Sequence, residues 1–178
     1  MPTDTVVRSG RLLRERMIIR RTAEMLVAAL EPADRFGGVC KLLASQFGAH
    51  FVAIAEVAPA KTVVRWSFAA DPASLNAIAE VAASGIDPQT PGVHPISGER
   101  VVLFLPLRLG VHHFGFLALG GGPERFARED ITLLETCARY MAVAIYNVTL
   151  ALEKERLEAL ASHDGLTGLY NRRALDER

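Results

Sequence analysis

The stretch that decides the fold is residues 106–147, which read PLRLGVHHFGFLALGGGPERFAREDITLLETCARYMAVAIYN. Together with the residues just before it, this stretch predicts two strands, over residues 100–108 and 111–119, joined at Leu109-Gly110 as a hairpin. The run Val101–Leu105 is apolar at every position, so we expect its strand to be central in a sheet and covered on both faces. Glycines and a proline end the second strand, and a long helix is predicted from residue 128.

Upstream of this stretch, the sequence predicts two helices, another hairpin and a loop. Apolar residues at three- and four-residue steps predict a helix over residues 5–30, with one face made of Leu12, Met17, Ile19, Ala23, Leu26 and Leu30. A second helix over 34–47 would turn Phe36, Val39, Cys40, Leu43 and Phe47 inward. Strands are predicted over 50–57 and 62–69, a short helix over 71–83 and an irregular loop over 84–99. This order favours the α+β class, with an antiparallel sheet between helices.

Composition narrows the class of protein. With 178 residues, half of them apolar, the chain has room for one domain and helical extensions. Its formal charge of zero gives no global reason to expect nucleic acid or an anionic membrane as a partner. No apolar run approaches the length of a membrane span, so we expect no membrane insertion. Two cysteines, Cys40 and Cys137, lack metal or redox spacing, which favours a reducing cytoplasm.

The element order and several residues resemble the C-terminal half of GAF domains. The matching features are Pro106-Leu107 on one strand, Gly115 with Leu117 on the next, and Phe126 before an acidic pair. The resemblance covers residues 15–150 and implies a GAF-like sheet flanked by helices, preceded by an N-terminal helical extension at 1–14. A PAS-like sensor is the alternative, although it would normally carry fewer helices before its first strand.

The GAF resemblance implies a small-molecule pocket between the sheet and residues 72–99. The predicted lining residues are Trp66, Phe68, Phe104, His112, His113 and Phe116. Neighbouring strand residues point to opposite faces, so only one histidine of the adjacent pair could enter the pocket. The identity of the ligand stays open, and packing of these side chains as plain core in a ligand-free dimerisation or protein-interaction module is the alternative.

Specific cofactors find little support in the sequence. His94, His112 and His113 could be imagined around iron, but adjacent strand histidines cannot both bind one metal, so we predict no metal site. Covalent bilin attachment and thiol-based sulfoxide reduction both need a pocket cysteine, and none occurs between Lys41 and Thr136. The signature that resembles cyclic-nucleotide-binding GAF domains is also absent.

The helix over 128–162 should be about 50 Å long, more than one small domain can cover. Its apolar residues follow a heptad-like spacing that we call the predicted seam: Leu134, Ala138, Met141, Ile145, Val148 and Leu152. The register slips near Leu152 and resumes at Leu157, in line with Leu150. We therefore expect a parallel homodimer through the N- and C-terminal helices, with residues 151–163 as a coiled-coil linker.

The end of the chain carries a motif, Asp164-Gly-Leu-Thr-Gly-Leu-Tyr-Asn-Arg-Arg173, that resembles the opening signature of GGDEF domains, the diguanylate cyclases. The resemblance assigns residues 164–178 to the start of such a domain. It implies that Asn171 contacts guanine and that Asp164, Leu166 and Thr167 form the coupling turn. It also implies that the longer protein makes cyclic di-GMP from two GTP with Mg²⁺. The metal-binding aspartate and the GG(D/E)EF hairpin do not occur in these residues, so we expect no catalytic residue and no activity in the 178-residue chain.

Overall fold

The computed structural model describes residues 4–28, 31–58, 61–71, 73, 74, 76, 80, 91–96, 100–122 and 126–162. Its elements are α1 (Asp4–Val27), α2 (Pro32–Phe47), β1 (Phe51–Ala58), β2 (Lys61–Ala69), β3 (Gly92–Pro95), β4 (Val101–Leu109), β5 (His112–Gly121) and α4 (Arg128–Ser162). The chain divides into two compact units, Met1–Ala144 and Ile145–Arg178.

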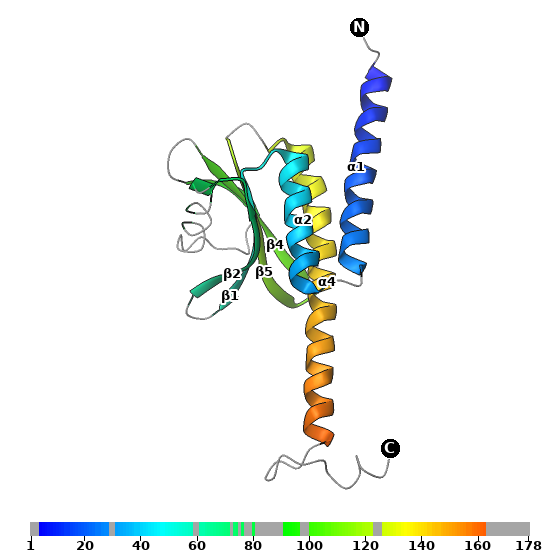
Figure 1. Ribbon diagram of the computed structural model, residues 1–178. Helices are drawn as coiled ribbons and strands as arrows, with labels where there is room; N and C mark the ends of the chain where they lie inside the picture. The colour runs from blue at the N-terminus through cyan, green and yellow to red at the C-terminus, as the bar shows by residue number, and fades with distance from the viewer. Residues whose placement is uncertain are drawn as a thin grey trace. The chain divides into compact units, whose positions relative to one another are not determined.

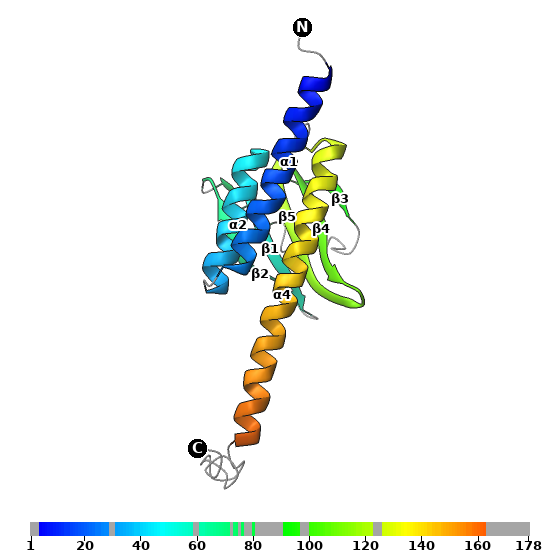
Figure 2. The ribbon, with the colours of Figure 1, turned by 90° about the vertical axis from the view of Figure 1, so that its right-hand side faces the viewer.

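The first unit is built on a five-stranded antiparallel sheet in the order β2-β1-β5-β4-β3. Helix α2 and the first half of α4 lie against one face of this sheet, and α1 packs on their outer side (Figures 1 and 2). We call the covered side the helix face and the other side the open face. The predicted α+β fold, an antiparallel sheet flanked by helices with a long C-terminal helix, is confirmed.

The helix face holds a densely packed apolar core. Phe36 of α2 is fully buried and stacks on Trp66 of β2, with ring centroids 4.3 Å apart. The five α2 residues predicted to point inward are all buried: Phe36, Val39, Cys40, Leu43 and Phe47. Helix α2 ends where Gly48 takes a left-handed conformation, with φ of 59°, as helix C-termini commonly do. This prediction was right because one continuous apolar face identifies the helix.

The buried face of α1 differs from the one predicted. Leu26 is buried as predicted, but Leu12 and Met17 are 49% and 41% exposed, and Ile18 and Thr22, which lay outside the predicted face, are buried. The hydroxyl of Thr22 lies 3.8 Å from the thiol of Cys137 on α4. A polar residue therefore occupies the centre of the buried stripe, which a search for apolar spacing alone does not find.

Two further predictions fall on residues 71–99. The predicted loop over 84–99 contains a strand, because β3 pairs with Val101–Phe104 of β4. This strand was not predicted because Pro95 argued against it, although proline is tolerated at a sheet edge and at strand ends. Most of the helix predicted over 71–83 lies outside the described residues.

The second unit contributes residues 145–162 of α4 to the described part of the chain. Its side chains are largely exposed from residue 149 to residue 158, and Lys154 pairs with Glu158 at 3.6 Å. Among the described residues, none of the helices combines the length and the apolar composition that crossing a bilayer requires.

Candidate functional site

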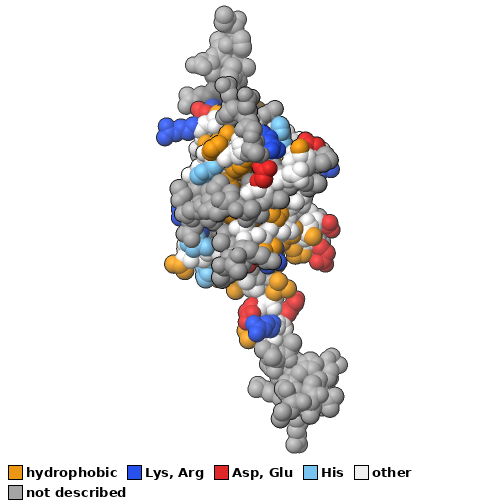
Figure 3. All heavy atoms as spheres, turned by 90° about the vertical axis from the view of Figure 1, so that its left-hand side faces the viewer, with side chains coloured by type: hydrophobic (Ala, Val, Ile, Leu, Met, Phe, Trp, Pro, Cys, Tyr) orange, Lys and Arg blue, Asp and Glu red, His pale blue; other side chains and the backbone are white. Residues whose placement is uncertain are grey.

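The open face of the sheet carries a compact set of buried side chains that we call the open-face cluster. Its members come from three strands and are each at most 2% exposed: Phe51, Ala53, Ala55, Val102, Phe104, Phe116 and Ala118. Strand alternation separates this cluster from the helix face, since neighbouring residues on β1 and β5 point to opposite sides. Figure 3 looks toward this side of the molecule, where hydrophobic and histidine side chains lie between segments that are not described.

Small residues form the middle of the cluster and aromatic rings form its walls. Ala53 of β1 pairs with Ala118 of β5, and Ala118 pairs in turn with Phe104 of β4. The rings of Phe104 and Phe116 meet edge to face, with centroids 5.0 Å apart. The cluster is tightly packed, and its aromatic rings suit a flat ligand or an aromatic packing partner.

Two glycines of β5 make the close packing of the cluster possible. A Cβ placed on Gly120 would lie 1.9 Å from the Phe51 ring, which occupies that space. Gly115 has a φ of 112°, and a Cβ there would lie 1.9 Å from the carbonyl oxygen of Ala55. Only glycine adopts that conformation easily, so β5 can approach β1 closely at this point.

Among the described residues, His94 of β3 brings a polar side chain to the aromatic ring of Phe104. It pairs with Val102, and its ring meets Phe104 at 5.5 Å between centroids with an angle of 69°. Its Nε2 atom is buried and has no hydrogen-bond partner within the described part of the chain. An imidazole nitrogen can donate or accept a hydrogen bond depending on its tautomer, so His94 offers a polar contact inside an otherwise apolar cluster.

The structure divides the residues predicted to line the pocket among three places. Phe104 and Phe116 lie in the open-face cluster. Trp66 and Phe68 pair with Ile54 and Val52 and so belong to the helix face, where Trp66 packs on α2. His112 and His113 are exposed at the start of β5.

These six residues therefore do not line one pocket. The sequence prediction missed Phe51, Ala53, Ala55 and Ala118, although the alternation of residues 51–55 could have identified three of them. No three His, Cys, Asp or Glu side chains gather as a metal site would need in the described residues.

The predicted seam on α4 is also divided. Leu134, Ala138 and Met141 are at most 2% exposed and belong to the core of the first unit, so they are not available to a second chain. Ile145 and Val148 are half-buried, and Leu152 is 61% exposed. A heptad pattern cannot distinguish a domain's own core from a partner helix, which is why the prediction failed here. Asn171 and the predicted coupling-turn residues Asp164, Leu166 and Thr167 lie outside the described residues.

Both cysteines are buried free thiols on helices. Burial raises the pKa of Cys40 to about 12. Burial also raises the pKa of Cys137, against the opposing effect of its hydrogen bond with Thr22. Because the thiolate is the reactive form, neither group is suited to nucleophilic chemistry in the folded protein.

Comparison with known proteins identifies the fold and family. The family model of the GAF domain matches residues 31–147, about two thirds of the chain. The GAF domain of a protein classed as a sensor histidine kinase, from Pseudomonas syringae pv. tomato, is 21% identical, covers 88% of this chain and 99% of its own, and has a TM-score of 0.66.

Two further solved structures are similar in fold. The GAF domain of a phosphoenolpyruvate-protein phosphotransferase from Coxiella burnetii is 15% identical, with 78% of this chain and 96% of its own covered and a TM-score of 0.61. A GAF domain from A. aeolicus, solved in an inactive state, is 14% identical, with 75% and 96% covered and a TM-score of 0.55. None of the curated proteins compared with the chain matches it significantly. The chain belongs to the GAF domain family, whose members are typical of signalling proteins.

Proposed function

We propose that this GAF domain is the regulatory sensor of a diguanylate cyclase, and that it binds a small molecule over the open-face cluster. GAF domains commonly bind small-molecule ligands. The observation that carries the proposal is the buried, unpartnered Nε2 of His94 beside the ring of Phe104. A buried polar atom left without a hydrogen bond costs about 1–3 kcal/mol, and a ligand that supplied the missing partner would recover it.

The cluster favours a flat ligand with one polar edge. Such a molecule would stack on the rings of Phe104 and Phe116 and place its polar edge at His94. The test is thermal unfolding of the chain across a panel of planar metabolites, with each hit repeated on His94→Phe. A stabilising hit that is lost in the variant supports the sensor. A panel without hits would favour the ligand-free dimerisation module instead.

Strand β5 provides a physical route from the ligand to α4. Its residues Phe116 and Ala118 face the open-face cluster, while Leu117 and Leu119 face the helices. A shift of β5 that accommodates a ligand on one face therefore displaces the leucines on the other. These leucines belong to the same core as Leu134 and Met141 of α4, so ligand binding can bias the position of this helix.

The cyclase output rests on the ten-residue motif that ends the helical linker. In this proposal Asp164, Leu166 and Thr167 form the coupling turn, Asn171 contacts the guanine base of GTP, and the reaction needs Mg²⁺. The two buried thiols fit a reducing cytoplasm. The test is cyclic di-GMP formation from GTP by the longer gene product. An inactive product that contains an intact GGDEF sequence would remove the cyclase from the proposal and leave the sensor in place.

The homodimer expected from the sequence needs a different seam, and α4 offers one. Within the second unit, its exposed residues repeat at three- and four-residue steps, which we call the exposed stripe: Asn147, Leu150, Lys154 and Leu157. Leu150 and Leu157 are 49% and 56% exposed. An asparagine within an apolar heptad stripe is typical of parallel pairs, where it fixes register.

Light scattering of two matched variants tests this seam. Leu150→Glu with Leu157→Glu places two charges in the exposed stripe and should reduce the mass from two chains to one. Leu152→Glu places a charge outside the stripe on an equally exposed residue and should leave the mass of two chains unchanged. The reverse pattern would restore the original predicted seam, and a wild-type mass of one chain would exclude both.

A further inference from the structure

A second concave site lies at the edge of the sheet, between β4 and α4, apart from the open-face cluster. Its volume is about 220 Å³. Strand β3 pairs only with Val101–Phe104, so from Leu105 onward this edge of β4 has no partner strand within the described residues. Pro106 lies on that edge, where it has no N–H group to offer a further strand.

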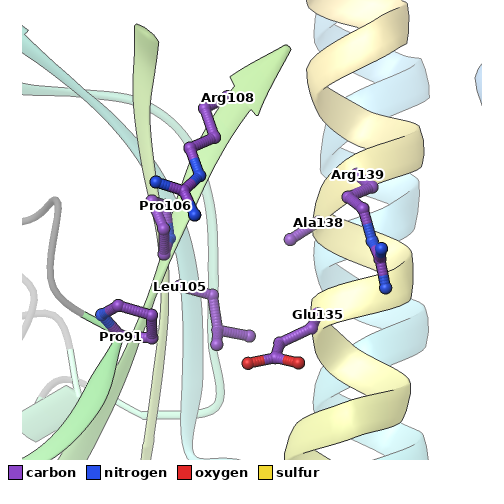
Figure 4. Close-up of a pocket in the computed structure, with 7 residues that line it drawn as sticks. All are labelled: Pro91, Leu105, Pro106, Arg108, Glu135, Ala138 and Arg139. Atoms are coloured by element: carbon purple, nitrogen blue, oxygen red, sulfur yellow. The ribbon is translucent and has the colours of Figure 1, made fainter. Parts of the chain in front are cut away.

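Opposite charges approach this cavity from its two walls. Figure 4 shows the carboxylate of Glu135 on α4 pointing toward β4, while the guanidinium group of Arg108 lies beside Pro106 on β4 and the side chain of Arg139 runs along α4; all three residues line the cavity. Within the described part of the chain, no ion pair or hydrogen bond engages the side chains of Arg108 and Glu135. Leu105, Pro106 and Ala138 provide apolar surface between them.

We infer that this cavity binds a small aliphatic zwitterion, with its carboxylate on Arg108 and its ammonium group on Glu135. A guanidinium group recognises a carboxylate through two parallel hydrogen bonds, and a carboxylate accepts from an ammonium group. The cavity is smaller than the roughly 300–1,000 Å³ typical of drug-sized ligands, which suits a molecule the size of an amino acid. Leu105, Pro106 and Ala138 leave a smaller apolar part of the lining for a short aliphatic body. A ligand held by both β4 and α4 would stabilise their contact.

Calorimetric titration of the 178-residue chain can test each half of this site separately. The probe is L-leucine, compared with 4-methylpentanoate, which lacks its ammonium group, and 3-methylbutylamine, which lacks its carboxylate. Arg108→Gln should weaken L-leucine and 4-methylpentanoate about tenfold or more and leave 3-methylbutylamine unchanged. Glu135→Gln should weaken L-leucine and 3-methylbutylamine by a similar factor and leave 4-methylpentanoate unchanged.

Two control variants test whether L-leucine binds in this cavity and nowhere else on the domain. Arg16→Gln removes an exposed charge on α1, which does not line the cavity, so L-leucine binding should stay within about twofold of wild type. His94→Phe alters the open-face cluster and should leave L-leucine binding unchanged, which makes this result independent of the proposed sensor ligand. Circular dichroism of each variant verifies folding. The inference is overturned if L-leucine does not bind, or if Arg108→Gln and Glu135→Gln bind all three probes as the wild type does.

Discussion

The two faces of the sheet are built from the same strands and differ in one respect. On the helix face, Leu103, Leu117 and Leu119 are fully buried among apolar side chains, and Phe36 stacks on Trp66. On the open face, the ring of Phe104 meets His94, whose buried Nε2 has no partner in the described residues. Buried polar groups in proteins are normally hydrogen-bonded, so the exception marks the face that is suited to binding. We therefore attribute stability to the helix face and propose recognition for the open face.

Phe36→Ala breaks the helix face and should have the largest effect. Removing a fully buried ring that stacks on Trp66 leaves a cavity, and such changes cost about 3–5 kcal/mol. Phe36→Leu keeps most of the volume and should cost less than about 1.5 kcal/mol. Urea unfolding measures both. Equal losses for the two variants would contradict the packing described for this face.

Gly115→Ala tests the close approach of β5 to β1, the two strands whose alternating residues form both faces of the sheet. The new Cβ would meet the carbonyl oxygen of Ala55 in a backbone conformation that is unfavourable for alanine, so we expect a loss of about 2–3 kcal/mol. Gly110→Ala is the matched control, because Gly110 also has a positive φ but has open space around it. Its loss should be about 1 kcal/mol. Thermal unfolding that ranks the two variants equally would argue against the close contact.

Alkaline pH tests the burial of Cys40 on the helix face. Its pKa rises from 9.0 to about 12 on folding, so the protonated thiol is favoured in the folded state. The resulting stability is complete below about pH 9 and is lost as pH rises toward about 12. By pH 10 the loss should reach about 1 kcal/mol. Urea unfolding at about pH 8 and pH 10 should show a smaller pH effect in Cys40→Ala; an unchanged pH effect would show that Cys40 is not its source.

The sequence predicted the fold more fully than it predicted the site. The apolar face of α2 was identified completely, because Phe36, Val39 and Leu43 leave no ambiguity of phase. In α1 the predicted set of buried residues was partly wrong. Thr22 is buried and contacts Cys137, a partner 115 residues away in the sequence. Spacing within one helix carries no information about such a partner.

The site was only partly predictable because it depends on which strands share a face. Composition marked Trp66 and Phe104 equally as aromatic strand residues, but the register of β1 with β2 and β5 places them on opposite faces. His94 lies on β3, a strand that was not predicted because it contains Pro95. Leu134 and Met141 do follow a heptad spacing, but the first unit itself buries them, so they are not available to a second chain.

Native mass spectrometry tests ligand binding at the open face most directly. Wild type and His94→Phe are each incubated with the low-molecular-weight fraction of a cell extract. The variant retains an aromatic ring beside Phe104 and removes the unpartnered nitrogen, so its stability should equal or exceed that of wild type by up to about 1 kcal/mol. We expect a bound small molecule on wild type and none on His94→Phe. Binding of the same molecule to both proteins, or a variant that is markedly less stable than wild type, would contradict the assignment of recognition to the open face.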